Sequence, residues 1–171
     1  YANKTKGTKA YAFEPSVQTF AVLDKNIQLN ACPHVAAYNV ALSNKTFADF
    51  LYMENTEAGH AKHAFGTDQS SIGHINTVYK QTCLGFKADD FAKQFNIPFP
   101  DHLKLDVDGN ELDILHGMGE SLSAVKSIIV EIMDQQDPNA DKIKNYLINK
   151  GFAPQNMSAY PNARNTVFTK Q

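Results

Sequence analysis

The chain has no tryptophan, only two cysteines, and no apolar run near the length of a membrane-spanning helix. Two cysteines do not suggest a disulfide framework, so we expect a reduced, cytoplasmic setting. A membrane helix needs about 20 apolar residues, so we expect no membrane partner. An excess of one charge is also missing, since 16 Lys and Arg stand against 18 Asp and Glu. The net charge of −2 therefore makes no electrostatic case for a nucleic-acid partner.

The size and composition of the chain are those of one globular domain. It has 171 residues, of which 43% are hydrophobic and 20% charged. A chain of this size can bury a sizeable core, so residues 1–171 are expected to form a single domain. The chain begins at Tyr1, and its first strand is expected within nine residues. We therefore expect it to be part of a longer protein.

The stretch 102–111 predicts a short strand that runs directly into a helix. Apolar and polar residues alternate in it, and an apolar helical pattern follows at once. Three carboxylates gather at the junction: Asp106, Asp108 and Glu111. Like charges are costly to hold together, and ligands of an open α/β sheet bind beyond the carboxyl ends of its strands. We expect a ligand site here, although the same residues could simply cap the helix.

The flanking segments predict an α/β fold. A strand over 9–14, a helix from Ser16 to Asn30 and a strand over 35–42 imply a parallel unit. The stretch 54–76 lacks periodicity and is expected to be a long functional or mobile loop. The remaining expected elements are a hairpin pairing 47–53 with 78–86, a strand over 127–133, helices over 89–95, 122–126 and 140–150, and a closing hairpin of 152–157 with 166–169.

Four segments, in this order, resemble the FkbM-type S-adenosylmethionine-dependent methyltransferases. They are Ala-Phe-Glu-Pro-Ser at 12–16, Asn-Val-Ala-Leu-Ser at 39–43, Lys-Leu-Asp-Val-Asp-Gly-Asn-Glu-Leu at 104–112 and Ile-Val-Glu-Ile at 129–132. The similarity extends from about residue 9 to about residue 170. It implies a Rossmann-like methyltransferase sheet that is mostly parallel, with a closing antiparallel hairpin.

The resemblance also implies roles for individual residues. Glu14 would hold the cofactor ribose, because two carboxylate oxygens can each accept one hydroxyl hydrogen of a cis-diol. Asn39 and Val40 would contact the adenine, the first by its amide and the second by packing. Asp106 would lie beside the sulfonium and the acceptor and assist deprotonation as the catalytic residue. The alternatives are a helix-terminal acid for Glu14 and an ordinary strand end for Asn39 and Val40.

The function that follows is methyl transfer from S-adenosylmethionine, with O-methylation of a small-molecule or sugar hydroxyl. The alternative is a non-catalytic methyltransferase-like binding module or an inactive fragment. The small-molecule acceptor would be the main partner, the oligomeric state stays open, and a homodimer is one option.

Metal binding is a weaker hypothesis. Asp106, Asp108 and Glu131 together would form an all-oxygen site suited to Mg²⁺. His60, His63 and His74 in the long loop could also ligate a metal, although solvated histidines are an equally simple interpretation.

One family feature is absent. Family members begin with a strand and a Gly-rich turn of the type Asp-x-Gly-Ala-Asn, whose glycine lets the backbone approach the methionine part of the cofactor. No such turn occurs in this sequence. In the family's strand order, the missing strand would lie between the strands of Phe13 and Leu105. The domain is therefore expected to be N-terminally truncated, either as a piece of a longer protein or as a true truncation with exposed strand edges.

Overall fold

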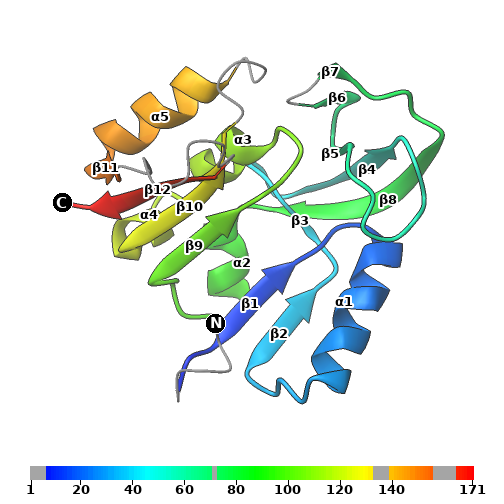
Figure 1. Ribbon diagram of the computed structural model, residues 1–171, viewed down its shortest axis with the longest axis horizontal. Helices are drawn as coiled ribbons and strands as arrows, with labels where there is room; N and C mark the ends of the chain where they lie inside the picture. The colour runs from blue at the N-terminus through cyan, green and yellow to red at the C-terminus, as the bar shows by residue number, and fades with distance from the viewer. Residues whose placement is uncertain (1–6, 71–72, 133–138, 156–164) are drawn as a thin grey trace.

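The computed structural model describes residues 7–70, 73–132, 139–155 and 165–171 (Figure 1). The helices are α1 (Val17–Leu29), α2 (Ala88–Gln94), α3 (Glu111–His116), α4 (Ser121–Ala124) and α5 (Ala140–Asn149). The strands are β1 (Ala10–Phe13), β2 (Val35–Tyr38), β3 (Ala41–Leu42), β4 (Phe47–Met53), β5 (His63–Phe65), β6 (Gln69–Ser70), β7 (Gly73–His74), β8 (Tyr79–Phe86), β9 (His102–Leu105), β10 (Ser127–Glu131), β11 (Phe152–Pro154) and β12 (Asn165–Lys170).

The larger hydrophobic core lies on a four-stranded sheet with the order β11-β12-β10-β9. β9 and β10 are parallel, and β12 is antiparallel to both β10 and β11. Alternation along β10 selects the buried face, because Ile128 and Val130 are fully buried whereas Ile129 between them is 37% exposed. α3, α4 and α5 supply the rest of this core. Each fully buried aliphatic side chain contributes about 1.5–3 kcal/mol.

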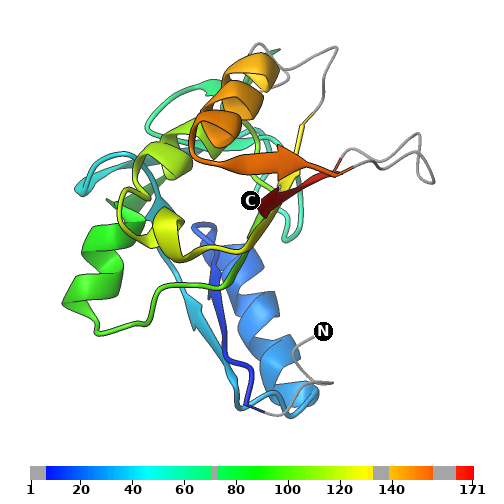
Figure 2. The ribbon, with the colours of Figure 1, turned by 90° about the vertical axis from the view of Figure 1, so that its left-hand side faces the viewer.

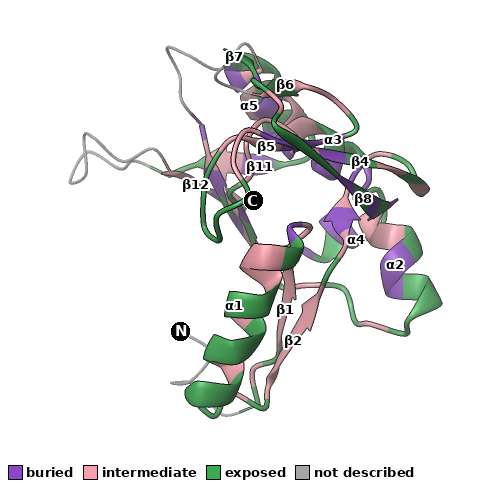
Figure 3. Cartoon of the chain, turned by 90° about the vertical axis from the view of Figure 1, so that its right-hand side faces the viewer, coloured by how far each residue is buried: buried purple, intermediate pink, exposed green. Residues whose placement is uncertain are grey.

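A second, parallel pair of strands forms the lower part of Figure 1. β1 pairs with β2 from Ala10 with Val35 to Phe13 with Tyr38, and α1 connects them. α1 begins after Ser16, whose Oγ accepts a hydrogen bond from Thr19 N at 3.3 Å. No residue of α1 is fully buried, and Figure 3 shows its outer face exposed. The pair is therefore less enclosed than the main sheet.

An aromatic cluster joins this pair to the rest of the molecule. Phe91 of α2 is 3% exposed. Its ring centroid lies 5.2 Å from Phe13, 4.9 Å from Tyr38 and 5.2 Å from Phe86, each in an edge-to-face arrangement. Such pairs contribute about 0.5–1.5 kcal/mol beyond the area they bury. Among the described residues, β1 and β2 form no strand pairing with the other sheets. Side-chain packing therefore holds this pair in position.

The remaining sheet has the order β3-β8-β4-β5. β4 and β8 are antiparallel, which confirms the predicted pairing of 47–53 with 78–86. β3 is parallel to β8, and β5 is antiparallel to β4. Gly85 is needed here, because a Cβ at this position would lie 2.2 Å from Cε1 of Phe65. The small core of this sheet contains Leu51, Met53 and Cys83.

The α/β class, the first parallel unit and the closing hairpin are confirmed, but two expectations are wrong. The predicted strand 35–42 is two strands, because the chain changes partner at Asn39 and Val40: β2 pairs with β1, and β3 pairs with β8. The predicted loop 54–76 contains β5, β6 and β7, since short backbone ladders need no apolar periodicity. The predicted ends at Met133 and Met157 lie outside the described residues.

The expected mostly parallel sheet is only partly observed. The described residues form four separate sheets with mixed pairing, because β4, β5, β8, β11 and β12 pair in the antiparallel sense. Within that part of the chain, β1 pairs only with β2 and β9 pairs only with β10. Each of these two strands therefore has one edge without a strand partner there. β1 and β9 lie side by side in Figures 1 and 2, and their carboxyl ends point the same way. Glu14 and the stretch 106–111 are thereby brought to one side.

Candidate functional site

Glu14 follows β1 directly and is held at the start of α1. Its backbone N–H donates to Tyr38 O at 3.1 Å, which extends the parallel pairing by one residue. Its Oε1 accepts a hydrogen bond from Ser16 N at 2.8 Å. Burial raises the pKa of the Glu14 carboxyl above its ordinary value, the Ser16 hydrogen bond opposes this rise, and the negative charge of Asp108 adds to it. Glu14 and Asp108 therefore share one electrostatic environment.

Two amide side chains fix the segment that carries Glu14. Gln81 is 8% exposed. It accepts from Val17 N at 2.9 Å and donates to Pro15 O at 2.7 Å. Asn39 donates through Nδ2 to the carbonyls of Glu14 and Pro15 at 2.8 and 3.0 Å. The turn after β1 is thus held from both β8 and the end of β2.

Asn39 and Val40 lie between β2 and β3, directly after the strand that pairs with β1. The Asn39 amide nitrogen is engaged with the backbone of the β1–α1 turn, so its Oδ1 is the atom left for another partner. Val40 is half-buried. Their role in binding adenine stays a prediction.

Asp106 and Asp108 have different environments although they are two residues apart. Asp106 follows β9, is exposed, and forms an ion pair with Lys104. Asp108 is half-buried, and its Oδ2 accepts from Lys62 N at 2.6 Å and from His63 N at 3.2 Å. Gly109, with a φ of 111°, then turns the chain into α3. The residue whose charge reaches Glu14 is therefore Asp108, and the catalytic role of Asp106 stays a prediction.

The segment 54–62 contacts both α1 and the turn after β9. Its Gly59 N donates to Thr19 Oγ1 on α1 at 3.1 Å, and Lys62 pairs with Glu54 at 3.0 Å. Asn110 Nδ2 reaches Phe65 O at 3.2 Å. These contacts join the loop after β4 to α1, and β5 to the turn after β9. The site is therefore assembled from segments far apart in the sequence.

Metal binding receives no support from the arrangement. In the ranges described, no three His, Cys, Asp or Glu side chains come together in a way that could hold a metal ion. Neither the set of Asp106, Asp108 and Glu131 nor the three histidines of the loop forms such a group there. His74 instead contacts Gln69 at 3.1 Å.

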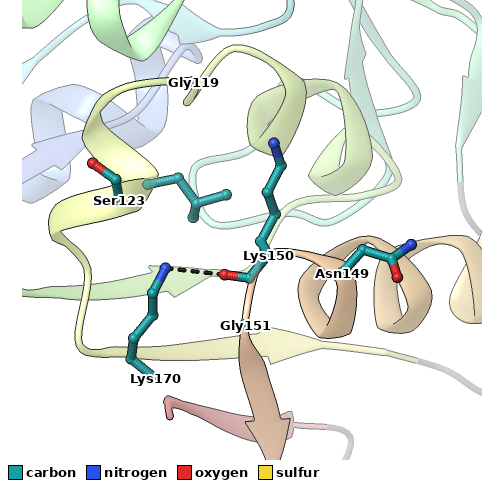
Figure 4. Close-up of a pocket in the computed structure, with 7 residues that line it drawn as sticks. Gly119, Ser123, Asn149, Lys150, Gly151 and Lys170 are labelled. Carbon is teal, nitrogen blue, oxygen red and sulfur yellow. Dashed lines mark hydrogen bonds between the residues drawn. The ribbon is translucent and has the colours of Figure 1, made fainter.

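A hollow of about 490 Å³ lies elsewhere, between α4 and the turn from α5 to β11 (Figure 4). Its polar groups include Ser123, Lys150 and Lys170, and Lys170 Nζ donates to Lys150 O at 3.0 Å. Lys170 ends β12 beside the beginning of β10, so the hollow is at the amino end of β9 and β10. It is thus at the end opposite Asp106 and separate from the Glu14 site.

The sequence interpretation missed Gln81 and the docking role of Asp108. A polar residue at a buried position of an alternating strand was the available signal for Gln81. Nothing in the sequence pairs Asp108 with the backbone of residues 62 and 63, because that contact spans two sheets.

As to membranes, none of the helices in the described ranges is both long and apolar enough to cross a bilayer.

Comparison with known proteins agrees with the resemblance. The methyltransferase FkbM domain matches residues 1–154. A curated relative, the hexuronic acid methyltransferase AglP of Haloferax volcanii, is 32% identical over 133 residues, which are 77% of this chain and 51% of that protein. The chain thus spans about half the length of this relative, and no solved structure matches it significantly. With its matching residues running from β1 through β11, the chain belongs to the FkbM methyltransferase family.

Proposed function

We propose that this chain is a methyltransferase that uses S-adenosylmethionine to O-methylate a sugar hydroxyl, and that the sugar is a hexuronic acid or a close analogue. Family membership and the activity for which the Haloferax relative is named support the reaction and the sugar class. The observation that carries the proposal is Glu14, a carboxylate at the carboxyl end of a parallel strand, where α/β sheets bind nucleotides.

The Glu14 carboxylate fits a ribose. Among the described residues, only Ser16 N donates to it, and it does so to Oε1. Oε2 is left to accept one hydroxyl hydrogen, and Oε1 has a second lone pair for the other. Asn39 Oδ1 is free to accept from an adenine amino group, and Val40 offers an apolar side chain beside it. Glu14, Asn39 and Val40 are therefore the residues proposed to hold the cofactor.

When bound, S-adenosylmethionine supplies an electrophilic methyl group on a sulfonium. The chain's own residues bind and orient the reactants, so that proximity lowers the barrier. Asp106 is proposed to accept a hydrogen bond from the acceptor hydroxyl and to hold it in place. Its ion pair with Lys104 keeps a positive charge nearby, which would also suit the carboxylate of a uronic acid.

A second candidate function rests on the free strand edges. β1 and β9 each have one edge without a strand partner in the described ranges, and such edges pair readily with another chain. A methyltransferase-like module that binds a protein partner or a second copy through these edges would explain them. Light scattering would then find a defined complex, and the cofactor would not bind.

The decisive experiment is calorimetric titration of S-adenosylhomocysteine into the natural, full-length polypeptide. We expect saturable binding, and a loss of about 10–100-fold in affinity for Glu14→Gln, because a hydrogen bond to a charged group contributes about 1.5–3 kcal/mol. Glu57→Gln, an exposed carboxylate in the loop after β4, is the matched control and should bind like the wild type. Absence of heat and of any thermal shift would overturn the proposal, and repeating the titration with EDTA tests for a contribution of Mg²⁺.

A further inference from the structure

His63 opens β5 at the place where three parts of the site meet. Its backbone N–H donates to Asp108 Oδ2 at 3.2 Å, and the charge of Asp108 reaches Glu14. The carbonyl of Asn55 lies 3.1 Å from its ring atom Nε2. His63 is therefore held from the turn after β9 and from the loop after β4, and Asp108 links it to Glu14, the residue proposed to bind the ribose.

The contact with Asn55 determines the tautomer of the ring. A carbonyl oxygen can only accept, so Nε2 must carry the hydrogen. A neutral imidazole has one N–H, so Nδ1 keeps its lone pair. Among the described residues, no group forms a hydrogen bond with Nδ1. Nδ1 is also not one of the fully buried polar atoms that lack a partner. The lone pair therefore faces space that solvent or a ligand can reach.

Burial of the ring favours its neutral form at neutral pH. Burial lowers the pKa of His63 below its ordinary value, the Asn55 hydrogen bond and the Asp108 charge oppose this, and nearby His60 adds to the lowering. Of the other charged groups of the loop, Glu54 and Lys62 form an ion pair, and Glu57 is exposed. The ring is thus a base that is already unprotonated when it meets its substrate.

We propose that Nδ1 of His63 is the general base that takes the proton of the acceptor hydroxyl; this rests on the proposed function. The O–H bond breaks, the proton binds the Nδ1 lone pair, and the electron pair stays on the acceptor oxygen for methyl transfer. His63 becomes an imidazolium, which Asp108 stabilises, and it later releases the proton to water. Asp106 orients the hydroxyl, and the Asn55 carbonyl keeps the ring in the required tautomer.

Nitrogen NMR of the ring in the natural full-length protein provides a test that needs no turnover. We expect the His63 ring to show a protonated Nε2, an unprotonated Nδ1, and a titration midpoint below that of an unperturbed histidine. In Asp108→Ala the midpoint should fall further, because a stabilising charge has been removed. A protonated Nδ1 in the wild type, or a midpoint at or above the ordinary value, would overturn the assignment.

Kinetics provide the second test, with methyl glycosides of glucuronic and galacturonic acid as probe acceptors. We expect His63→Ala to lower kcat by about 10²–10⁴-fold, as for loss of a general base, with S-adenosylhomocysteine affinity unchanged. Added imidazole should restore part of the rate, and the acid limb of the kcat–pH profile should disappear. His74→Gln on β7 is the matched control and should keep the wild-type profile.

The outcomes separate the two proposals. Loss of the acid limb in Asp106→Asn with its retention in His63→Ala would assign the base to Asp106 and contradict the His63 proposal. If the wild type fails to bind S-adenosylhomocysteine, the proposed function fails, whatever the ring nitrogen spectra show. If it binds the cofactor product but methylates neither probe, the sugar class is wrong, and the ring nitrogen spectra still decide the state of His63.

Discussion

The carboxylate of Asp108 accepts a hydrogen bond from the backbone N–H of Lys62 at 2.6 Å and thereby fixes the loop after β4 to the turn after β9. The two residues are 46 positions apart in sequence. A half-buried carboxylate that accepts backbone N–H groups is expensive to remove, because the donors are then left without a partner. The geometry of the candidate site therefore depends on one side chain that binds no ligand in the proposed scheme.

Replacing Asp108 by alanine should destabilise the fold more than replacing Asp106. Asp108→Ala leaves the N–H groups of Lys62 and His63 without their acceptor and should lower the free energy of unfolding by about 1–3 kcal/mol. Asp106→Ala breaks only an exposed ion pair and should cost less than about 1 kcal/mol. Urea denaturation measures both. Equal losses, or unchanged hydrogen exchange at residues 62 and 63 in Asp108→Ala, would contradict the docking role.

Glu14 should make the fold less stable as the pH rises. Its pKa in the folded protein is raised, chiefly by burial, so the folded state holds its proton more tightly than the unfolded state does. This contribution is fully present below the ordinary glutamate pKa and is lost as the pH rises through the higher folded value. Glu14→Gln should therefore be more stable than the wild type at pH 7 and similar to it near pH 4, while it binds cofactor more weakly.

Thermal melts of both proteins across pH 4–8 measure this difference. Glu57→Gln serves again as the control, because the Glu57 side chain is exposed. A Glu14→Gln protein that is less stable than the wild type at pH 7 would show that burial does not raise the pKa of this carboxyl in the folded state.

Gly117 should not tolerate a side chain. A Cβ at this residue would lie 2.1 Å from the backbone oxygen of Ser43, which cannot rotate away. Gly117→Ala should therefore lower the free energy of unfolding by about 1–3 kcal/mol, the usual cost of overpacking. In Gly119→Ala the nearest atom is a side-chain oxygen of Asp89 at 3.3 Å, which can shift, so the loss should be clearly smaller. Urea denaturation of the two variants decides, and a larger loss for Gly119→Ala would contradict the packing of α3 on the end of β3.

The two thiols should differ in reactivity. Cys83 is 5% exposed in β8, and burial raises the pKa of its thiol, whereas Cys32 after α1 is half-buried. Because the thiolate is the reactive form, Cys32 should react with a disulfide reagent well before Cys83 does. Cys32→Ser should abolish the fast phase in the native protein, and denaturation should release the slow thiol. A fast phase that survives in Cys32→Ser would mean that the core of β4 and β8 is open.

The amino-acid sequence determined the elements whose signals are local. The alternation from residue 102 to 105, the cap at Ser16 and the apolar period of α1 and α5 each act over a few residues, and each appears in the structure. The family also follows from short segments read in order. The positions of Glu14 and Asp106 after β1 and β9 were predictable for the same reason.

Tertiary structure alone decided which partners those segments take. The change of partner at Asn39, the docking of residues 62 and 63 on Asp108 and the contact of Gln81 with the Glu14 turn all join residues distant in sequence. Hydrogen bonds of this kind produce no periodic pattern in the sequence, because a buried donor bonds to whichever acceptor the packing brings near it. The sequence therefore predicted which carboxylates belong to the site. The packing determined that Asp108 is the carboxylate whose negative charge acts on Glu14.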